Sequence, residues 1–212
     1  DFPVVSGNVS FYNETQKKSI NPTPVIGGVG LIKNLKRIMT KNLKENGSSL
    51  LVVGRTLGHL YQSELLREVL NIKEGPPPEV NLFNEKNNGL IISKLISENL
   101  LNSVHDISSG GILVSLAEMC ISSKIGAKIN VPVDNVNKFE YFFGEDQGRY
   151  LIEVNEKNKK KVINILEKNT IYYDIIGITQ KDTLYLNKDN NINLSLLNDN
   201  ISFWYRNYFK EN

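Results

Sequence analysis

The pattern of apolar and polar residues predicts a mixture of helices and strands along this chain. Residues 49–54 form a continuous apolar run, which is typical of a strand buried on both faces. Other segments repeat apolar residues at helical spacing or alternate them with polar residues. The expected helices span residues 62–70, 84–99, 108–123, 156–168 and 194–209. The expected strands span residues 49–54, 103–107, 128–133, 149–154, 172–179 and 183–186.

The apolar side of each helix is expected to face a core. These positions are Leu65, Leu66, Val69 and Leu70; Leu90, Ile91, Leu95 and Ile96; Ile112, Leu113, Leu116, Met119 and Cys120; Val162, Ile163, Ile165 and Leu166; and Leu197, Ile201, Trp204 and Tyr208. The segment Gly75–Pro78 cannot lie inside a helix, so it is expected to be a rigid connector. The strands at 172–179 and 183–186 are expected to form a hairpin.

Mixed helices and hairpins indicate an α+β fold, with helices packed on a mixed or antiparallel sheet, and not a doubly wound parallel sheet. Residues 1–28 supply one or two strands and a turn, and they are too few to bury a core of their own. We therefore expect residues 1–28 to be the end of an incomplete domain and residues 29–212 to form a complete one.

The composition is that of a globular protein, with 212 residues, 40% hydrophobic residues and a formal net charge of +2. This near balance of charge provides no basic footprint for nucleic acid or membrane, and the lysine cluster at 157–161 is expected to be a solvated helix face. The single cysteine, Cys120, excludes an internal disulfide and a multi-cysteine zinc site. The chain contains no long apolar span, and its acidic start at Asp1 lacks a basic signal-peptide region. We expect a cytoplasmic protein.

The first candidate site lies near the start of the chain, where a β-forming run is interrupted at Gly7. Glycine permits close backbone approach, and alternation places Asn8, Ser10 and Tyr12 on one face of the strand. Amide and hydroxyl oxygens suit Mg²⁺ held through substrate phosphates. The same residues also fit an ordinary edge strand with a glycine bulge, and Glu14 is equally well explained as a salt-bridge residue.

Several longer motifs follow one another over nearly the whole chain. They are Val4–Thr15, Asn21–Gly30, Gly58-His59-Leu60 with Gln62-Ser63, Gly75–Pro78, His105–Gly111 and Phe143–Arg149. In this order they resemble the second half of phosphoribosylformylglycinamidine synthase, the PurL-type, ATP-dependent ligase of purine synthesis. The resemblance implies a PurM-like C-terminal domain, preceded by the last strands of a truncated PurM-like N-terminal-type domain.

The resemblance also assigns roles at the first site. In the family, the glycine at the position of Gly7 contacts ATP, the asparagine at Asn8 ligates Mg²⁺, and the serine at Ser10 touches the ribonucleotide substrate. The implied cofactors are therefore ATP and Mg²⁺. Thiamine-phosphate and selenophosphate kinase relatives are disfavoured, because the run from Gly7 to Glu14 is specific to the purine branch.

The second candidate site is the stretch from His105 to Gly111. A carboxylate followed by a Gly-Gly turn at a helix N-terminus places backbone N–H groups where a phosphate could bind, with Asp106 on its metal. The alternative is that Ser108 or Ser109 only caps the helix. The resemblance implies that Asp106 binds Mg²⁺ and that Ser108 contacts an auxiliary nucleotide. The family usually has aspartate at the position of Ser109, so the local negative charge is reduced here.

No residue of this chain is expected to be catalytic. Neither His59 nor His105 matches the family's catalytic histidine, and no nucleophile pairs with His105 and Asp106, so both histidines are expected to be structural. Glu145, Asp146 and Arg149 could bind metal or phosphate, but they fit better as an ion-pair cluster that fixes the following strand.

The resemblance implies a reaction in which ATP activates the amide oxygen of formylglycinamide ribonucleotide and ammonia displaces phosphate to give the amidine. The implied partners are the missing N-terminal half of the synthase, a glutaminase subunit that supplies ammonia and a small accessory subunit. On this view the chain alone does not catalyse the reaction. The alternatives are a non-catalytic nucleotide-binding or assembly module and an inactive remnant.

Overall fold

The computed structural model describes residues 3–9, 12–32, 34–130, 136–186 and 190–210. Clustering of neighbouring residues divides the chain into two compact units, Asp1–Lys33 and Asn34–Asn212. The two units are described separately below. The predicted domain boundary between residues 28 and 29 stays a prediction.

Within the described part of the larger unit, seven strands form one sheet in the order β4-β6-β3-β7-β5-β8-β9. The strands are β3 (Ser49–Val53), β4 (Ser103–Asp106), β5 (Gly126–Ile129), β6 (Tyr150–Val154), β7 (Tyr173–Gln180), β8 (Thr183–Tyr185) and β9 (Asn191–Asn193). Neighbouring strands are antiparallel except for β5 and β8, which are parallel. The predicted α+β class is confirmed.

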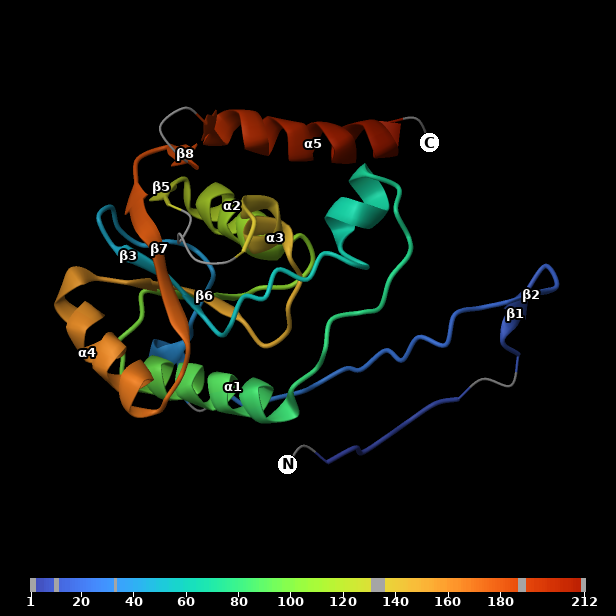
Figure 1. Ribbon diagram of the computed structural model, residues 1–212, viewed down its shortest axis with the longest axis horizontal. Coiled ribbons are helices and arrows are strands. Elements are labelled where there is room, and N and C mark those ends of the chain that lie inside the picture. The colour runs from blue at the N-terminus through green and yellow to red at the C-terminus, as the bar shows by residue number, and fades with distance from the viewer. Residues whose placement is uncertain (1–2, 10–11, 33, 131–135, 187–189, 211–212) are drawn as a thin grey trace. The chain divides into compact units, whose positions relative to one another are not determined.

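Helices cover both faces of this sheet (Figure 1). The helical segments are η1 (Leu35–Arg37), η2 (Leu65–Val69), α1 (Leu82–Ser97), α2 (Gly111–Ser123), α3 (Lys138–Phe143), α4 (Glu156–Lys168) and α5 (Leu194–Lys210). α1 and α4 pack on one face, and α2 and α3 pack on the other. This arrangement explains the continuous apolar sequence of β3, because both of its faces contact helices.

Alternate residues of β3 supply the two cores. Leu50 and Val52 belong to the cluster formed with α2 and α3, whereas Leu51 and Val53 belong to the cluster formed with α1 and α4. All four side chains are completely buried. At roughly 1.5–3 kcal/mol for each fully buried aliphatic side chain, this strand contributes more to folding than its five residues suggest.

Asparagine side chains fix the starts of three helices. Asn81 accepts a hydrogen bond from the backbone N–H of Asn84 at α1, and Asn155 accepts one from Asn158 at α4. At α3, Asn137 and Glu140 form a capping box. Such caps are each worth about 1 kcal/mol. They explain why α1 and α4 begin close to their predicted positions.

The smaller unit has little regular structure. Its described strands, β1 (Glu14–Thr15) and β2 (Lys18–Ser19), pair as a short antiparallel hairpin. Its apolar residues are exposed, including Val5, Val9 and Val25, each about nine-tenths accessible. All described residues of this unit are exposed.

Two predicted features of the larger unit are wrong. The helix expected at 62–70 is only a short π-helical segment, Leu65–Val69, without buried residues, and the predicted core positions Val69 and Leu70 are exposed. The hairpin expected from 172–186 does not form, since β5 lies between β7 and β8. A side chain at Gly126 would collide with the carbonyl oxygens of Lys181 and Thr183, so glycine lets the chain cross the end of β5 tightly.

Some predicted core positions also face solvent. In α1, Leu90 is exposed and Ile92 is buried in its place. In α5, Leu194 is buried and Leu197 packs on the core, but Ile201, Trp204 and Tyr208 are more than half exposed. The helical spacing was correct in both cases. Helical spacing alone does not show how far along a helix the neighbouring elements cover its apolar side.

Candidate functional site

The first predicted site lies in the smaller unit. Gly7 and Asn8 are exposed and belong to no helix or strand. A side chain at Gly7 would meet no atom within 4 Å in the described structure, so packing within this chain does not require glycine there. Ser10 lies outside the described residues. Glu14 is exposed in β1, where it pairs with Ser19.

The second predicted site lies in the larger unit, between β4 and α2. Asp106 is the last residue of β4 and its side chain is 72% exposed. Ser108 follows in the connecting loop, and its carbonyl oxygen accepts a hydrogen bond from the backbone N–H of Gly111. Neither serine side chain caps α2. The residue at the cap position is Gly110, with φ of 83°, which excludes the simple serine cap as an explanation of this motif.

The amide expected to receive a phosphate already has a protein acceptor. The backbone N–H of Gly110 donates to Glu145 Oε1 at 2.8 Å, and the same oxygen accepts from the N–H of Glu64, also at 2.8 Å. A bound anion at this amide would have to displace the Glu145 carboxylate or share the N–H with it. Of the backbone N–H groups that the sequence places at this turn, that of Gly110 is therefore not free to bind a phosphate.

A chain of charged side chains leads from Asp106 to the surface of α2. The two ring nitrogens of His105 lie 3.3 Å from Asp106 Oδ1 and 2.9 Å from Glu118 Oε2. Glu118 Oε2 also accepts a hydrogen bond from Lys41 Nζ at 2.7 Å. The hydrogen bond from Lys41, together with that from His105, holds the pKa of Glu118 below its usual range although partial burial opposes this shift. His105 thus links two carboxylates and orients the one at Asp106.

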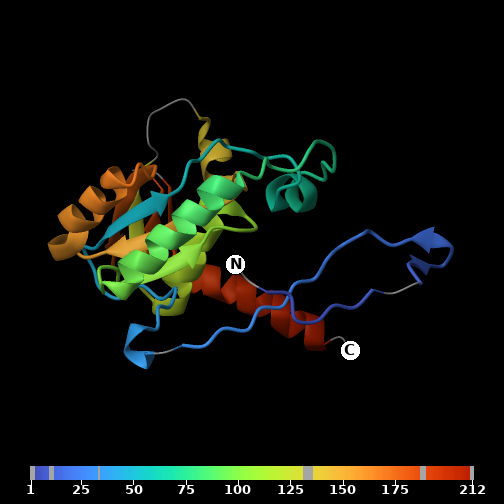
Figure 2. The same cartoon turned by 90° about the horizontal axis from the view of Figure 1, so that it is seen from below.

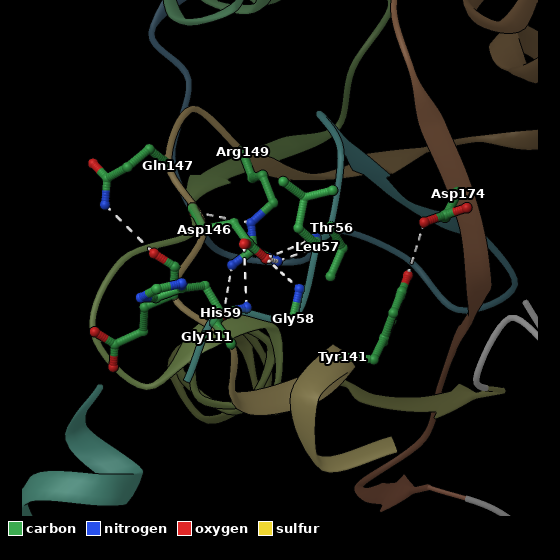
Figure 3. Close-up of polar contacts among 12 residues, drawn as sticks. Thr56, Leu57, Gly58, His59, Gly111, Tyr141, Asp146, Gln147, Arg149 and Asp174 are labelled. Atoms are coloured by element: carbon green, nitrogen blue, oxygen red, sulfur yellow. Dashed lines mark hydrogen bonds and ion pairs between the residues drawn. The ribbon is translucent and has the colours of Figure 1, made fainter. Parts of the chain in front are cut away.

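Next to this motif, Asp146 gathers three successive backbone amides (Figure 3). Its Oδ2 accepts from Leu57 and Gly58 at 3.0 and 2.9 Å, and its Oδ1 accepts from His59 at 3.2 Å. Three converging N–H groups form an anion-binding nest, and here an internal carboxylate fills it. The loop that carries Gly58-His59-Leu60 is fixed in this way.

Arg149 holds the same loop from its other side. Its guanidinium is completely buried and donates to the carbonyl oxygens of Asp146 and Gly144 and to Thr56 Oγ1. Burial lowers the pKa of Arg149, and the nearby Asp146 carboxylate opposes that shift. The predicted cluster is present in part: Asp146 and Arg149 form an ion pair, whereas Glu145 accepts the backbone N–H groups of Glu64 and Gly110. The cluster fixes residues 56–59 and Glu64 as well as the strand that follows it, β6.

Beside this cluster the larger unit has an open hollow of about 1440 Å³, which neither predicted site lines. Its walls come from the loop after β3, the start of α1 and the segment before β7. Arg55 lies over the ring of Tyr172 at 5.6 Å, and Asn88 donates to the carbonyl oxygen of Gly148. The sequence analysis singled out neither Arg55 nor Tyr172 as a residue of this hollow. For Arg55 the sequence does give a signal, since it follows the apolar run 49–54 directly and so begins a loop at the end of a buried strand.

In the described part of the chain, Asp106 could bind Mg²⁺ only together with ligands supplied from elsewhere. Among the described residues, no group of three or more His, Cys, Asp or Glu side chains could hold a metal ion. Asp106 offers one exposed carboxylate, and Mg²⁺ is often bound by one or two carboxylates together with substrate phosphates. Asp106 could supply one ligand of that kind. No described helix is both long and apolar enough to cross a membrane.

Curated relatives match almost the whole chain. Phosphoribosylformylglycinamidine synthase subunit PurL of Pelagibacter ubique is 48% identical over 210 residues, which cover 99% of this chain and 29% of that protein. The same subunit of Rhodopseudomonas palustris strain BisB5 is 40% identical over 98% of this chain and 28% of its own length. The chain thus spans less than a third of the curated relatives that it matches.

Solved structures share the fold at low sequence identity. The structure of T. maritima PurL complexed with ATP has a TM-score of 0.61 at 15% identity and covers 77% of this chain and 27% of that chain. The complex of T. maritima PurL with FGAR has a TM-score of 0.63, with 15% identity, 77% coverage of this chain and 30% of that chain. The structure of PurLQS from Thermotoga maritima has a TM-score of 0.58 at 18% identity, and it covers 77% of this chain and 28% of that chain.

The family model of the AIR synthase related protein, C-terminal domain, matches residues 45–187. These residues comprise the strands β3 to β8 and the helices α1 to α4, so the match covers most of the sheet and of its two cores. The predicted resemblance to PurL-type synthases and the PurM-like C-terminal fold are confirmed. This chain belongs to the family of AIR synthase related proteins, through their C-terminal domain.

Proposed function

We propose that this chain is part of a cytoplasmic, ATP-dependent ligase that converts formylglycinamide ribonucleotide and ammonia into the corresponding amidine. One observation carries the proposal: relatives named phosphoribosylformylglycinamidine synthase subunit PurL match 98–99% of the chain at 40–48% identity. The relatives are more than three times as long. The chain would therefore contribute contacts to a site that other parts of the polypeptide complete.

The first proposed site contains Gly7, Asn8 and Ser10. The exposed backbone at Gly7, with no side chain, would let the ATP phosphates approach closely. The side-chain carbonyl of Asn8 would supply one oxygen ligand to Mg²⁺, and the hydroxyl of Ser10 would bind the ribonucleotide. When bound, Mg²⁺ neutralises charge on the transferring phosphoryl group. T. maritima PurL shares the fold and has been solved complexed with ATP and with FGAR, which supports ATP and the ribonucleotide as ligands.

The second proposed site contains Asp106 and Ser108, for an auxiliary nucleotide with its Mg²⁺. The exposed carboxylate of Asp106 is held by His105, so its direction is fixed without its oxygens being buried. Glu145 opposes a phosphate at Gly110, because its carboxylate already accepts that N–H. The site would therefore bind nucleotide more weakly than the Gly-Gly turn alone suggests.

Partner subunits belong to the same proposal. The neighbour PurLQS is a multi-subunit assembly by its name, which supports a glutaminase and a small accessory subunit as partners of the complete enzyme. Ammonia can replace the glutaminase in an assay, so the ligase reaction can be tested without them.

The test is a chimeric enzyme in which this chain replaces the matching segment of Pelagibacter ubique PurL. Amidine formation and phosphate release are measured with formylglycinamide ribonucleotide, ATP, Mg²⁺ and ammonium. We expect an active chimera whose kcat/KM falls at least 100-fold with Asn8→Ala and at least tenfold with Ser10→Ala. Asn46→Ala, an exposed asparagine in a turn of the larger unit, is the matched control and should leave the rate unchanged.

An inactive but folded chimera would argue against the ligase and in favour of a non-catalytic module. Calorimetric titration of the 212-residue chain with Mg·ADP tests the second site separately. We expect Asp106→Asn to weaken binding at least tenfold and Glu145→Gln to strengthen it several-fold, while Asp199→Asn on α5 has no effect. Equal affinities in all four proteins would rule out the second site.

A further inference from the structure

Helix α5 carries an apolar stripe that begins on the domain core and continues beyond it. Leu194 is buried and Leu197 packs against the cluster formed with α2 and α3. Ile201, Trp204 and Tyr205 follow Leu197 by 4, 7 and 8 positions, so they lie on the same face. Their exposed fractions are 60%, 67% and 59%. Figure 2 shows the second half of α5 running out away from the helices on which its first turns pack.

The other side of α5 is largely polar, although it also carries the exposed residues Leu196 and Phe203. Asp199, Arg206 and Lys210 lie on it, and all three are exposed. The helix is therefore amphipathic along its whole length. Its first half uses the apolar face as core, and its second half presents the same kind of face to solvent.

The exposed aromatic rings support one another. Trp204 stacks on Tyr208 with ring centroids 5.6 Å apart, and Tyr205 contacts Phe209 at 4.7 Å. Rings that are already held by neighbours lose little conformational freedom on docking. The four rings of Trp204, Tyr205, Tyr208 and Phe209 are each about three-fifths exposed. At 150–250 Å² per aromatic side chain, they expose roughly 400–600 Å² together, a large share of one side of a standard interface.

The position of α5 in the sequence indicates what covers it. The helix lies after the family-model match at 45–187, and it adds Leu194 and Leu197 to a core that most of its length does not enter. It nevertheless falls within the 208–210 residues shared with the PurL relatives, of which the chain spans only 28–29%. The helix thus accompanies the longer polypeptide, and most of that polypeptide lies outside this chain.

We propose that Ile201, Trp204 and Tyr205, here called the α5 stripe, dock on the part of the synthase polypeptide that lies outside this chain. The inference rests on the proposed function. The receiving surface would be apolar, with acceptors for the Trp204 indole N–H and the Tyr205 hydroxyl. Covalent linkage favours this occupant over a second copy of the chain, because it raises the effective concentration of the surface to the millimolar range.

Hydrogen exchange of α5 peptides tests the proposal in the 212-residue chain and in the full-length Pelagibacter chimera. We expect the amides around the α5 stripe to exchange at least 100-fold more slowly in the chimera. The double variant Trp204→Ser/Tyr205→Ser should abolish this protection. Phe203→Ser, an equally exposed aromatic residue on the far side of the helix, is the matched control and should retain it.

The outcomes separate this inference from the proposed function. Equal exchange in the two proteins, or protection that survives the double variant, would overturn docking even if the chimera makes amidine. Protection of the isolated chain that rises with concentration, together with a dimer mass in sedimentation, would assign the stripe to a second copy. An inactive chimera with protected α5 would count against the ligase and still support docking.

Discussion

Asp146 Oδ2 lies 3.7 Å from Arg149 Nη1, and neither side chain has appreciable contact with water. The pair is the centre of the loop that joins α3 to β6. Because Asp146 accepts three backbone N–H groups and Arg149 donates to two carbonyl oxygens, each charge is also satisfied by the main chain. Removing one member leaves the other buried without its counter-charge.

Asp146→Ala is expected to lower the free energy of unfolding by about 3–5 kcal/mol, the range for breaking a buried ion pair from one side. Urea denaturation followed by circular dichroism measures this change. Glu156→Ala is the matched control, since Glu156 and Lys159 have the same i,i+3 spacing but Glu156 is 78% exposed. That change should cost less than about 0.5 kcal/mol. Equal costs would show that burial does not decide the effect.

Gly111→Ala is expected to destabilise the domain much more than Gly47→Ala. Both glycines have positive φ, of 71° and 86°, so alanine is strained by about 1–2 kcal/mol at either position. A Cβ at Gly111 would also lie 2.6 Å from the carbonyl oxygen of Phe142, whereas at Gly47 it would meet nothing within 4 Å. We expect overpacking to add about 1–3 kcal/mol at Gly111. Thermal unfolding of both variants gives the difference, and a smaller loss at Gly111 would contradict it.

Glu118→Gln is expected to destabilise the protein at neutral pH and not in acid. The pKa of Glu118 is lowered in the folded state, so its contribution is complete above the ordinary value of 4.5 and is lost as the pH falls through the folded value. For a partly exposed pair with Lys41 we expect about 0.5–1 kcal/mol at pH 7. Unfolding of both proteins from pH 7 to pH 3 measures the difference. A constant difference over this range would refute the assignment.

Cys120 is expected to resist thiol reagents in the native protein. It is completely buried, and burial raises the pKa of its thiol to about 12 from an ordinary 9.0. At pH 8 the thiolate fraction therefore falls about 1000-fold, before any steric protection is counted. Labelling with a chromogenic disulfide should be slow in buffer and fast in urea. Rapid labelling of the folded chain would show that α2 is not packed as described.

Periodicity predicted most of the larger unit because its elements bury regular faces. α4 was predicted with its observed limits, since Asn155 caps its start and Val162 and Leu166 fall on one side. The β7–β8 relation could not be predicted in the same way. Strand spacing says that two strands follow each other, but it cannot show that Gly126 makes room for β5 between them.

The candidate site shows a similar limit. Residue types and spacing pointed to Asp106 and the pair at 145–146, because carboxylates beside glycines suggest anion or metal chemistry, and the family resemblance added Ser108. They could not show that Glu145 reaches the N–H of Gly110, 35 residues away in sequence. Long-range contacts of this kind depend on where two loops meet, and no local pattern encodes that.

The internal position of β3, with a neighbouring strand on each side, has a consequence for synthesis on the ribosome. Its neighbours in the sheet are β6 and β7, and 97 residues separate Val53 from its partner Tyr150. At roughly 5–20 residues per second, the segment Ser49–Val53 waits about 5–20 seconds after its own translation before that partner exists. During this interval its apolar side chains and backbone groups lack the sheet that later encloses them. A chaperone that binds short extended apolar segments would find a target in β3 of the nascent chain.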